Sequence, residues 1–195
     1  MMKTEHVFDE NQQIPSLHLM LEQGAVLISQ VGWGAFSLAM LAEKMRIPPG
    51  ILYRQIASKD AFLWFFMQHI TAETLQTIDV TGLDNARDKI FEGVMQRLDT
   101  WLPYKPMLNV LSYELPQDPL CAIRLVPKMA ESFDWILSLA GISTTGMKGL
   151  LKLKAFGVFY GLIVAAWLKD DSPDQGQTLK ALDLNLDRFM PVFLL

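Results

Sequence analysis

The sequence predicts an all-α fold, and three observations support this prediction. Apolar residues recur at three- and four-residue steps along most of the chain, no stretch shows the alternation typical of a strand, and turn residues separate the apolar segments. The 195 residues are 51% hydrophobic and 19% charged, so the chain holds enough apolar material for a folded core.

Four helices are expected in the N-terminal part of the chain, each beginning at a residue suited to a helix start. A serine hydroxyl accepts a free N–H group of the first turn, and proline is tolerated there because its missing N–H would be unpaired anyway. Residues 1–15 are polar and are expected to form a flexible lead-in. The expected helices are 17–31 after Ser16, 38–45 after Ser37, 49–56 after Pro48 and about 59–78 after Ser58.

Five further helices follow, each bounded by proline, glycine or short polar segments. The last two are the most apolar, and the tight connection between them predicts an antiparallel pair. Within that connection, Asp170 and Asp171 are expected to form a solvated cap rather than an acid and base pair. The five expected ranges are 84–101, 105–115, 120–140 with Pro127 as a candidate kink, 145–168 and 174–193.

Charge and hydropathy exclude several classes of protein. With 17 basic and 21 acidic residues the net charge is −4, so no overall basic surface attracts nucleic acid, although residues 33–60 carry four basic and two acidic side chains. The longest uncharged apolar stretch, 155–168, is shorter than the roughly 18 to 20 residues that cross a bilayer, so no membrane span is expected. The polar start of the chain lacks the features of a secretory signal, so a cytoplasmic location is expected.

Residues that would carry catalysis or hold a metal do not form a recognisable pattern. His6, His18 and His69 are far apart in the sequence, and none is spaced from another as metal ligands are, so no metal site is expected. Cys121 is the sole cysteine and is assigned to the core. No serine elbow or dinucleotide-binding glycine motif occurs, so neither enzymatic activity nor a cofactor is expected.

The segment from Phe36 to Phe62 carries the strongest functional signal. Two short helices separated by three or four residues, with a longer helix on either side, have the dimensions of a helix-turn-helix unit. Periodicity alone leaves a plain helical bundle open as the alternative. In that case Tyr53 would belong to the core and Lys59 would be a solvated surface charge.

A set of residues in and just before this segment carries a more specific pattern, namely Gly32, Trp33, Phe36, Ser37, Leu38, Leu41, Ala42, Pro49, Gly50, Leu52, Tyr53, Ser58 and Lys59. In register, this pattern resembles the N-terminal signature of the TetR family of bacterial transcriptional regulators. The resemblance implies a helix-turn-helix DNA-binding domain over 16–60, a helical ligand-binding and dimerisation domain over 61–195, and a homodimer on palindromic double-stranded DNA. The family usually represses transcription and is released by a small hydrophobic or amphipathic ligand.

The resemblance also implies which residues contact DNA, with Tyr53 and Lys59 on phosphates. Three departures bear on this: Arg46 replaces the turn glycine, Pro48 replaces a serine or threonine cap, and Ile51 cannot hydrogen-bond a base. Direct base readout is therefore expected to be limited, with Ile51 on a thymine methyl and polar pairing left to arginine and glutamine. The expected DNA-binding residues are Ser37, Arg46, Gly50, Ile51, Tyr53, Arg54, Gln55 and Lys59.

Bulky apolar residues in the C-terminal part are expected to serve as core, ligand pocket and dimer interface. The C-terminal half also resembles, more faintly, the TetR-fold lipid-binding accessory protein of ubiquinone biosynthesis, which provides an alternative function. An intrachain core is the alternative for the proposed interface on the last two helices. The expected pocket residues are Trp101, Met107, Leu111, Tyr113, Phe133, Trp135 and Phe156, and the expected interface residues are Gly157, Tyr160, Gly161, Val164, Leu182, Leu186 and Phe189.

Overall fold

A computed structural model of the chain describes residues 15–195, and over this range the protein is all-α, as expected. The described part contains nine α-helices, two short 3-10 segments and no strand. The expected lead-in, except for its last residue, lies outside the described residues. The helices are α1 (Leu17–Val31), α2 (Leu38–Met45), α3 (Pro49–Gln55), α4 (Lys59–Thr77), α5 (Ala86–Trp101), α6 (Lys105–Glu114), α7 (Pro119–Leu139), α8 (Gly146–Lys169) and α9 (Gly176–Phe193).

The helix starts expected from the sequence are confirmed where serine supplies the cap. The hydroxyls of Ser16, Ser37 and Ser58 each accept the backbone N–H three residues on, which satisfies one of the free donors of the first turn. Pro48, in contrast, makes no side-chain hydrogen bond at the start of α3. Pro127 lies inside α7, which continues through it as one helix.

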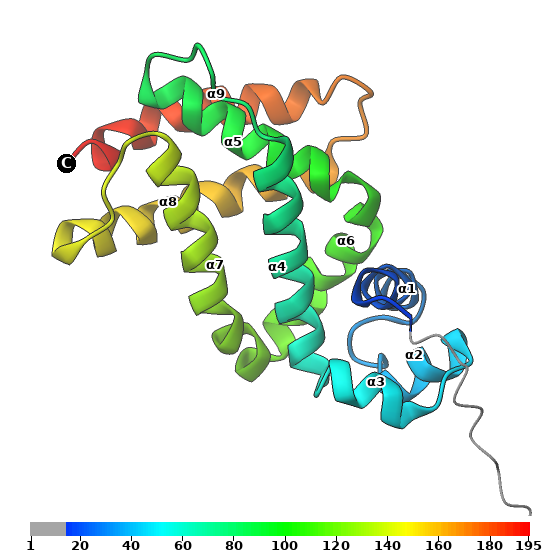
Figure 1. Cartoon of the computed structure of the whole chain (residues 1–195). Coiled ribbons are helices and arrows are strands. Elements are labelled where there is room, and N and C mark those ends of the chain that lie inside the picture. Colours follow the sequence, from blue (N-terminus) through cyan, green and yellow to red (C-terminus); the bar gives the residue numbers. More distant parts are fainter. Residues whose placement is uncertain (1–14) are drawn as a thin grey trace, which may run out of the picture.

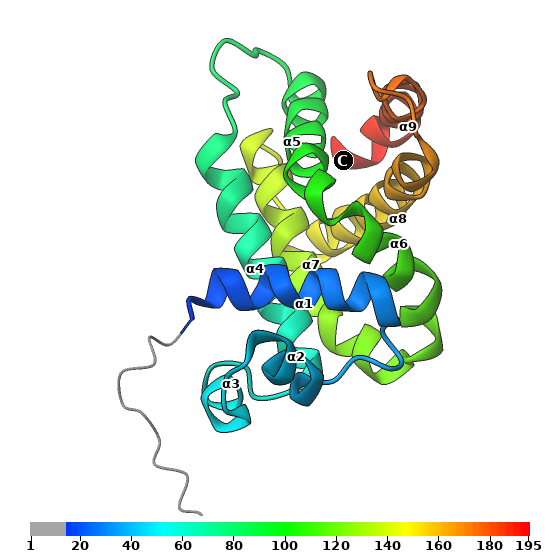
Figure 2. The same cartoon turned by 90° about the vertical axis from the view of Figure 1, so that its right-hand side faces the viewer.

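The helices form two connected groups (Figures 1 and 2). Helices α1, α2 and α3 lie together at one end, and α4 leads from them toward α5, while α8 and α9 run antiparallel at the other end. One apolar core joins α1–α4 to α6 and the first half of α7, and a second joins α5, the end of α7, α8 and α9. Trp101 and Leu108 contact both cores, so the two groups are packed against each other.

Helix α8 consists largely of apolar residues. Its 24 residues, with a mean hydropathy of 1.6 over the most apolar 18 of them, would suit a membrane span by length and composition, although its longest uncharged stretch is too short for one. Core helices of soluble proteins pass the same test, and Phe156, Phe159 and Ile163 are fully buried in the second core. Only 33% of its most apolar window is buried, however, so much of its apolar surface faces outward.

The connection between α8 and α9 corrects the expectation of a solvated acidic cap. Asp170 is 3% exposed, and its carboxylate accepts the backbone N–H of Thr178 at 2.7 Å and its hydroxyl at 2.8 Å. The other carboxylate oxygen accepts the N–H and hydroxyl of Ser172. Asp171 is exposed, as expected. Asp170 therefore anchors the first turn of α9 from inside the protein.

Asp170→Asn is expected to destabilise the protein near neutral pH and to matter less in acid. The hydrogen bonds from Ser172 and Thr178 hold the pKa of Asp170 well below its usual range. A lowered folded-state pKa adds stability above the unfolded pKa of about 3.9, and this stability is lost as the pH falls below that value. Urea unfolding at about pH 7 and about pH 3 measures this, because the difference between wild type and variant should shrink in acid. Asp171→Asn is the control, and an unchanged difference at both pH values would contradict the role of the carboxylate.

Candidate nucleic-acid interface

The turn between α2 and α3 is a closed helix end followed by proline. The N–H of Ile47 bonds the carbonyl of Ala42 at 3.0 Å, and the N–H of Arg46 bonds that of Glu43 at 3.0 Å, which is the double hydrogen bond of a Schellman helix end. Arg46 has φ 55° and ψ 38°, the left-handed conformation that normally favours glycine. The chain therefore makes the expected turn with an arginine in the strained position.

Replacing Arg46 by glycine is expected to raise the free energy of unfolding. The left-handed conformation costs a residue with a Cβ about 1–2 kcal/mol, and the greater freedom of glycine in the unfolded chain offsets about half of the gain. A net increase of about 0.5–1 kcal/mol is expected from urea unfolding. Arg46→Ala keeps the Cβ and should give no such increase. Equal gains for both variants would show that the loss of the arginine charge, and not relief of backbone strain, raises the free energy of unfolding.

Helix α3 has a buried face and an exposed face. Leu52 is fully buried and Ile56, just after the helix, is fully buried as well, so these two residues fix the orientation of α3 against the N-terminal core. Tyr53 is 46% exposed and Arg54 is also exposed. A Cβ added at Gly50 would meet no atom within 4 Å, so the fold itself places no steric demand for glycine there. The exposed face thus carries residues that the core does not use.

The remaining residues expected to contact DNA differ in how far their side chains are buried or already hydrogen-bonded. Ser37 uses its hydroxyl to cap α2, and Ile51 and Gln55 are half-buried along the sides of α3. Arg54 donates from Nε to the carbonyl of Gly50 at 3.3 Å, which leaves its terminal nitrogens without a bond in the described part of the chain. The structure therefore brings the expected residues together on one end of the molecule.

Lys59 is held more tightly than the sequence indicated. Its ammonium group donates to the backbone carbonyl of Trp33, lies 3.4 Å from the carbonyl of Gly34, and sits 4.2 Å from the centre of the Trp33 ring. A lysine ammonium has three N–H donors, so at most one is left for a phosphate. Lys59 is therefore not a solvated surface charge: it links the start of α4 to the loop before α2 and keeps one N–H for another acceptor.

The same loop is tied to the C-terminal helices by contacts that the sequence did not reveal. The Trp33 indole N–H donates to Asp118 at 3.3 Å, and the N–H of Gly34 donates to Glu114 at 2.8 Å. Asp118 also caps the start of α7. A change at the junction of α6 and α7 would therefore act directly on the loop that positions α2.

Two solved structures share the overall fold of this chain. A TetR transcriptional regulator from Nitrosomonas europaea aligns with a TM-score of 0.71 at 15% sequence identity, over 88% of this chain and 96% of that chain. A TetR transcriptional regulator from Rhodococcus sp. RHA1 aligns with a TM-score of 0.56 at 19% identity, over 87% of this chain and 94% of that chain. The chain has the TetR fold. No protein-family model and no curated protein matches the sequence.

In this TetR fold an apolar cavity of about 260 Å³ lies where the two cores meet. Trp101 and Leu111, both expected in a pocket, line it together with residues of α4, α6, α7 and α8, and Ser112 supplies the polar group. The size and lining suit a small, largely apolar molecule. The other lining residues are Leu63, Phe66, Met67, Leu108, Leu115, Leu125, Met129, Val164 and Leu168.

The other expected pocket residues lie elsewhere. Met107 is buried beside a shallow pocket between α1 and α6, and Phe133 lines a groove between α7 and α8. Phe156 is fully buried in the second core, Trp135 is partly buried against that core, and Tyr113 is 65% exposed. The structure therefore gathers two of the seven expected residues in the apolar cavity.

A buried arginine adjoins the cavity through Trp101. Arg97 is 1% exposed, donates to the hydroxyl of Ser132, and forms no ion pair with any acidic residue in the described range. Its guanidinium carbon lies 5.1 Å from the centre of the Trp101 ring and 5.8 Å from that of Tyr160. Arg97 Nε, Trp101 Nε1 and the Tyr160 hydroxyl lack hydrogen-bond partners within residues 15–195. Burial raises the pKa of Tyr160 to about 12, so its phenol stays protonated at neutral pH.

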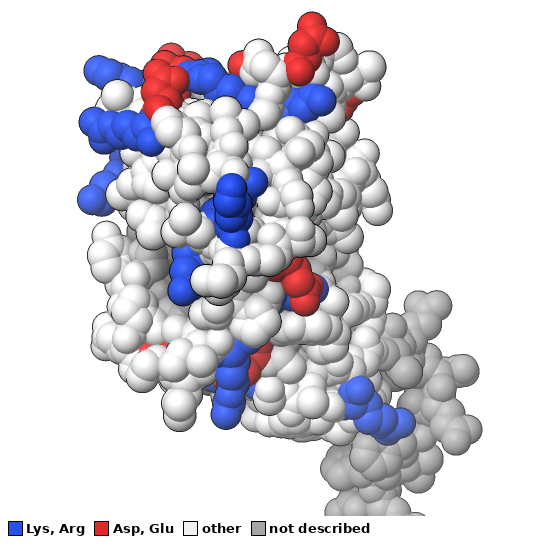
Figure 3. Space-filling view, turned by 90° about the vertical axis from the view of Figure 1, so that its left-hand side faces the viewer, with Lys and Arg blue, Asp and Glu red and all other residues white. Residues whose placement is uncertain are grey.

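The residues expected at a dimer interface divide into buried and accessible ones. Tyr160, Leu182 and Leu186 are at most 3% exposed and belong to the intrachain core, which is the alternative that the sequence left open. Gly161 is exposed, whereas Gly157, Val164 and Phe189 are half-buried. Other apolar residues of these helices do face outward, namely Met147, Leu150, Leu151, Val158, Leu162 and Leu184. Figure 3 shows the side where α8 begins and α9 ends: uncharged surface covers most of it, with basic side chains scattered over it and charged groups gathered at its upper end.

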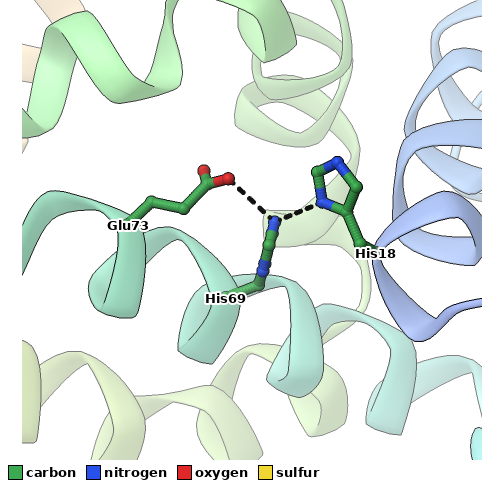
Figure 4. Close-up of side chains that lie close together, drawn as sticks. All are labelled: His18, His69 and Glu73. Atoms are coloured by element: carbon green, nitrogen blue, oxygen red, sulfur yellow. Dashed lines mark hydrogen bonds and ion pairs between the residues drawn. The ribbon is translucent and has the colours of Figure 1, made fainter. Parts of the chain in front are cut away.

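The cysteine lies where the sequence predicts it, whereas two of the histidines lie closer together than their sequence spacing suggests. Cys121 lies in the core, as expected, and burial raises the pKa of its thiol to about 12, so it is not a thiolate nucleophile at neutral pH. The spacing of the histidines in the sequence predicted no metal site, but the fold brings His18 and His69 within hydrogen-bond distance of each other (Figure 4). His6 lies outside the described residues.

Proposed function

We propose that this chain is a sequence-specific DNA-binding transcriptional regulator of the TetR type, acting in the cytoplasm as a repressor. The observation that carries the proposal is the exposed face of α3, because Gly50, Tyr53 and Arg54 contribute little to the core that the rest of the helix builds. An open Cα at the start of a helix lets a phosphate approach the backbone N–H groups, and a phenol can donate to a phosphate oxygen. The basic excess of residues 33–60 adds local attraction within an acidic protein.

Sequence readout would rest on few side chains. With α3 in the major groove, Ile51 offers an apolar contact to a thymine methyl, and Arg54 and Gln55 can pair with guanine and adenine. Tyr53 and the remaining N–H of Lys59 would hold the flanking phosphates. We expect phosphate contacts to provide most of the affinity and Arg54 most of the base discrimination.

A homodimer would supply the second recognition helix. Leu151, Val158 and Leu162 are exposed on α8 at spacings of seven and four residues, so they share one face of the helix, and Leu184 adds an exposed apolar residue on α9. Pairing this surface with its symmetry mate would cover apolar area that the monomer leaves open. Two α3 helices about 34–36 Å apart would then match a palindromic site.

The cavity and Arg97 together favour an amphipathic, anionic ligand. An isolated buried guanidinium is unfavourable without a counter-charge, whereas a ligand carboxylate would accept hydrogen bonds from Arg97, Trp101 and Tyr160. The apolar part of the ligand would occupy the neighbouring cavity. Such a ligand would act only through unequal affinity for dimers that can and cannot bind DNA.

Two sets of contacts would couple the apolar cavity to the DNA-binding end of the molecule. Leu111, Ser112 and Leu115 line the cavity, and Glu114 beside them holds the N–H of Gly34 in the loop before α2. Helix α4 also lines the cavity and carries Lys59, the clamp on that loop, at its first turn. Filling the cavity would therefore shift α4 and the α6–α7 junction, and with them the spacing of the recognition helices.

The proposal is tested by binding of the purified chain to double-stranded DNA from upstream of its own gene. Saturable, sequence-dependent binding supports it. Binding that is weak and equal on all duplexes would instead favour the alternative of a lipid- or isoprenoid-binding accessory protein on the same fold. The apolar cavity would serve that function without DNA.

A further inference from the structure

Two helices of different groups bring a compact set of nitrogen and oxygen donors together (Figure 4). His18 is at the start of α1, and His69 and Glu73 are one turn apart on α4. His18 Nδ1 lies 2.7 Å from His69 Nε2, and His69 Nε2 lies 3.1 Å from a carboxylate oxygen of Glu73. The three side chains each offer one atom, and these atoms all lie within 4.8 Å of one another.

The second nitrogen of His18 is also occupied. His18 Nε2 lies 3.3 Å from a carboxylate oxygen of Glu22, one turn further along α1. In a neutral imidazole one nitrogen carries the proton and the other has a free lone pair. Donation from Nε2 to Glu22 therefore leaves Nδ1 as the lone-pair atom, and Nδ1 is the atom that faces His69 and Glu73.

Hydrogen bonds alone cannot satisfy all of the acceptor atoms in this cluster. His69 Nε2 has two neighbours that accept, His18 Nδ1 and the Glu73 carboxylate, but a single N–H can point at only one of them. A cation between the three atoms would satisfy all of their lone pairs at once. Ligands of a tetrahedral zinc ion, at about 2.0–2.1 Å from the metal, are about 3.3 Å apart, so small side-chain rotations suffice to open the cluster.

We propose that His18, His69 and Glu73 bind a divalent transition-metal ion of the zinc type. Two imidazoles and one carboxylate are a donor set that suits zinc and its neighbours rather than calcium or magnesium. Glu22 is a positioning residue, because a carboxylate on the far ring nitrogen orients a ligating histidine and increases its basicity. The side chains of His18 and His69 are 48% and 24% exposed, so an ion and a water ligand can reach the site from solvent.

The position of the site gives it a structural consequence. Helix α1 belongs to the N-terminal group that contains α2 and α3, whereas α4 leads from this group to the rest of the chain (Figure 1). A metal ion would cross-link the first turn of α1 to the second half of α4 and fix the angle between them. This holds whether or not the chain binds DNA, so the metal site stands independently of the proposed regulatory function.

The test is titration of the tag-free full chain with zinc chloride by isothermal calorimetry, with cobalt(II) absorption as a report on tetrahedral nitrogen and oxygen ligation. One ion per chain is expected. His18→Ala and His69→Ala should each lower the affinity more than the roughly 10- to 100-fold expected for the positioning variant Glu22→Gln. His6→Ala removes the remaining histidine of the chain and is the matched control, with wild-type affinity expected.

Circular dichroism establishes that each variant is folded, and His18→Gln and His69→Gln replace any alanine variant that is not. The absence of saturable zinc and cobalt binding to the wild type would overturn the site. Wild-type affinity in either His18→Ala or His69→Ala would overturn the bridge between α1 and α4. Loss of binding in His6→Ala would place the ion on a different set of ligands.

Discussion

Tyr53→Phe combined with Lys59→Ala is expected to weaken DNA binding by about 100- to 10,000-fold, since each of the two hydrogen bonds to a charged phosphate contributes about 1.5–3 kcal/mol. The loss should be similar on every duplex, because phosphates carry no sequence information. Removing the lysine charge should also reduce the slope of log affinity against log salt by about 0.9. Fluorescence anisotropy at two salt concentrations measures both effects.

The clamp of Lys59 on Trp33 requires a control for folding. Lys59→Ala removes hydrogen bonds to the loop before α2, so the melting temperature of each variant has to be measured beside its DNA affinity. Tyr53→Phe alone removes a single exposed hydroxyl and isolates the phosphate contact. Lys180→Ala, at an exposed lysine on α9, is the matched charge control. A loss confined to one DNA sequence would contradict the assignment of these residues to phosphates.

Arg97→Met is expected to stabilise the ligand-free protein and to abolish its preference for anionic ligands. Replacing a buried ion pair by apolar residues of similar volume often adds about 1–4 kcal/mol, and a gain of this order is expected for a buried guanidinium that has no counter-charge. In the wild type, decanoate should raise the melting temperature by about 5–10 °C at a hundredfold excess over its dissociation constant, and decanol by less. In the variant the two compounds should act alike.

The measurement is a thermal unfolding series with decanoate and decanol on wild type, Arg97→Met and the exposed control Arg188→Met. Arg188 is on the outer surface of α9, so its replacement should change neither the stability nor the ligand preference. A variant that is less stable than the wild type would show that Arg97 already has a satisfactory environment. Equal responses of the wild type to acid and alcohol would remove Arg97 from the ligand site.

Local features of the fold were predictable from the sequence because their causes are local. The serine caps, the apolar periodicity and the proline at the start of α3 specify helix positions without reference to distant residues. The exposed and buried faces of α3 follow from the same periodicity, with Leu52 and Ile56 inward and Tyr53 outward. The departure at Arg46 was also visible, because its place in the turn requires a left-handed residue.

Contacts between distant segments were not predictable in this way. The clamp of Lys59 on Trp33, the bond from Trp33 to Asp118 and the meeting of His18 with His69 depend on how helices cross. One local signal was present: His18 and His69 are each followed four residues later by glutamate, which places a carboxylate one turn from each imidazole. Helix spacing could not distinguish the inward residues of α8 from the outward ones, because α8 is apolar on most sides.

The most direct test of the central claim is fluorescence anisotropy of the purified chain with its own upstream intergenic DNA and with a scrambled duplex of equal composition, at two salt concentrations. The account predicts saturable binding to the native fragment, with a preference of at least about a hundredfold and a clear salt dependence. Equal, weak binding to both duplexes would contradict it. Mass spectrometry of the molecule that copurifies in the apolar cavity would then be the route to a lipid-binding function.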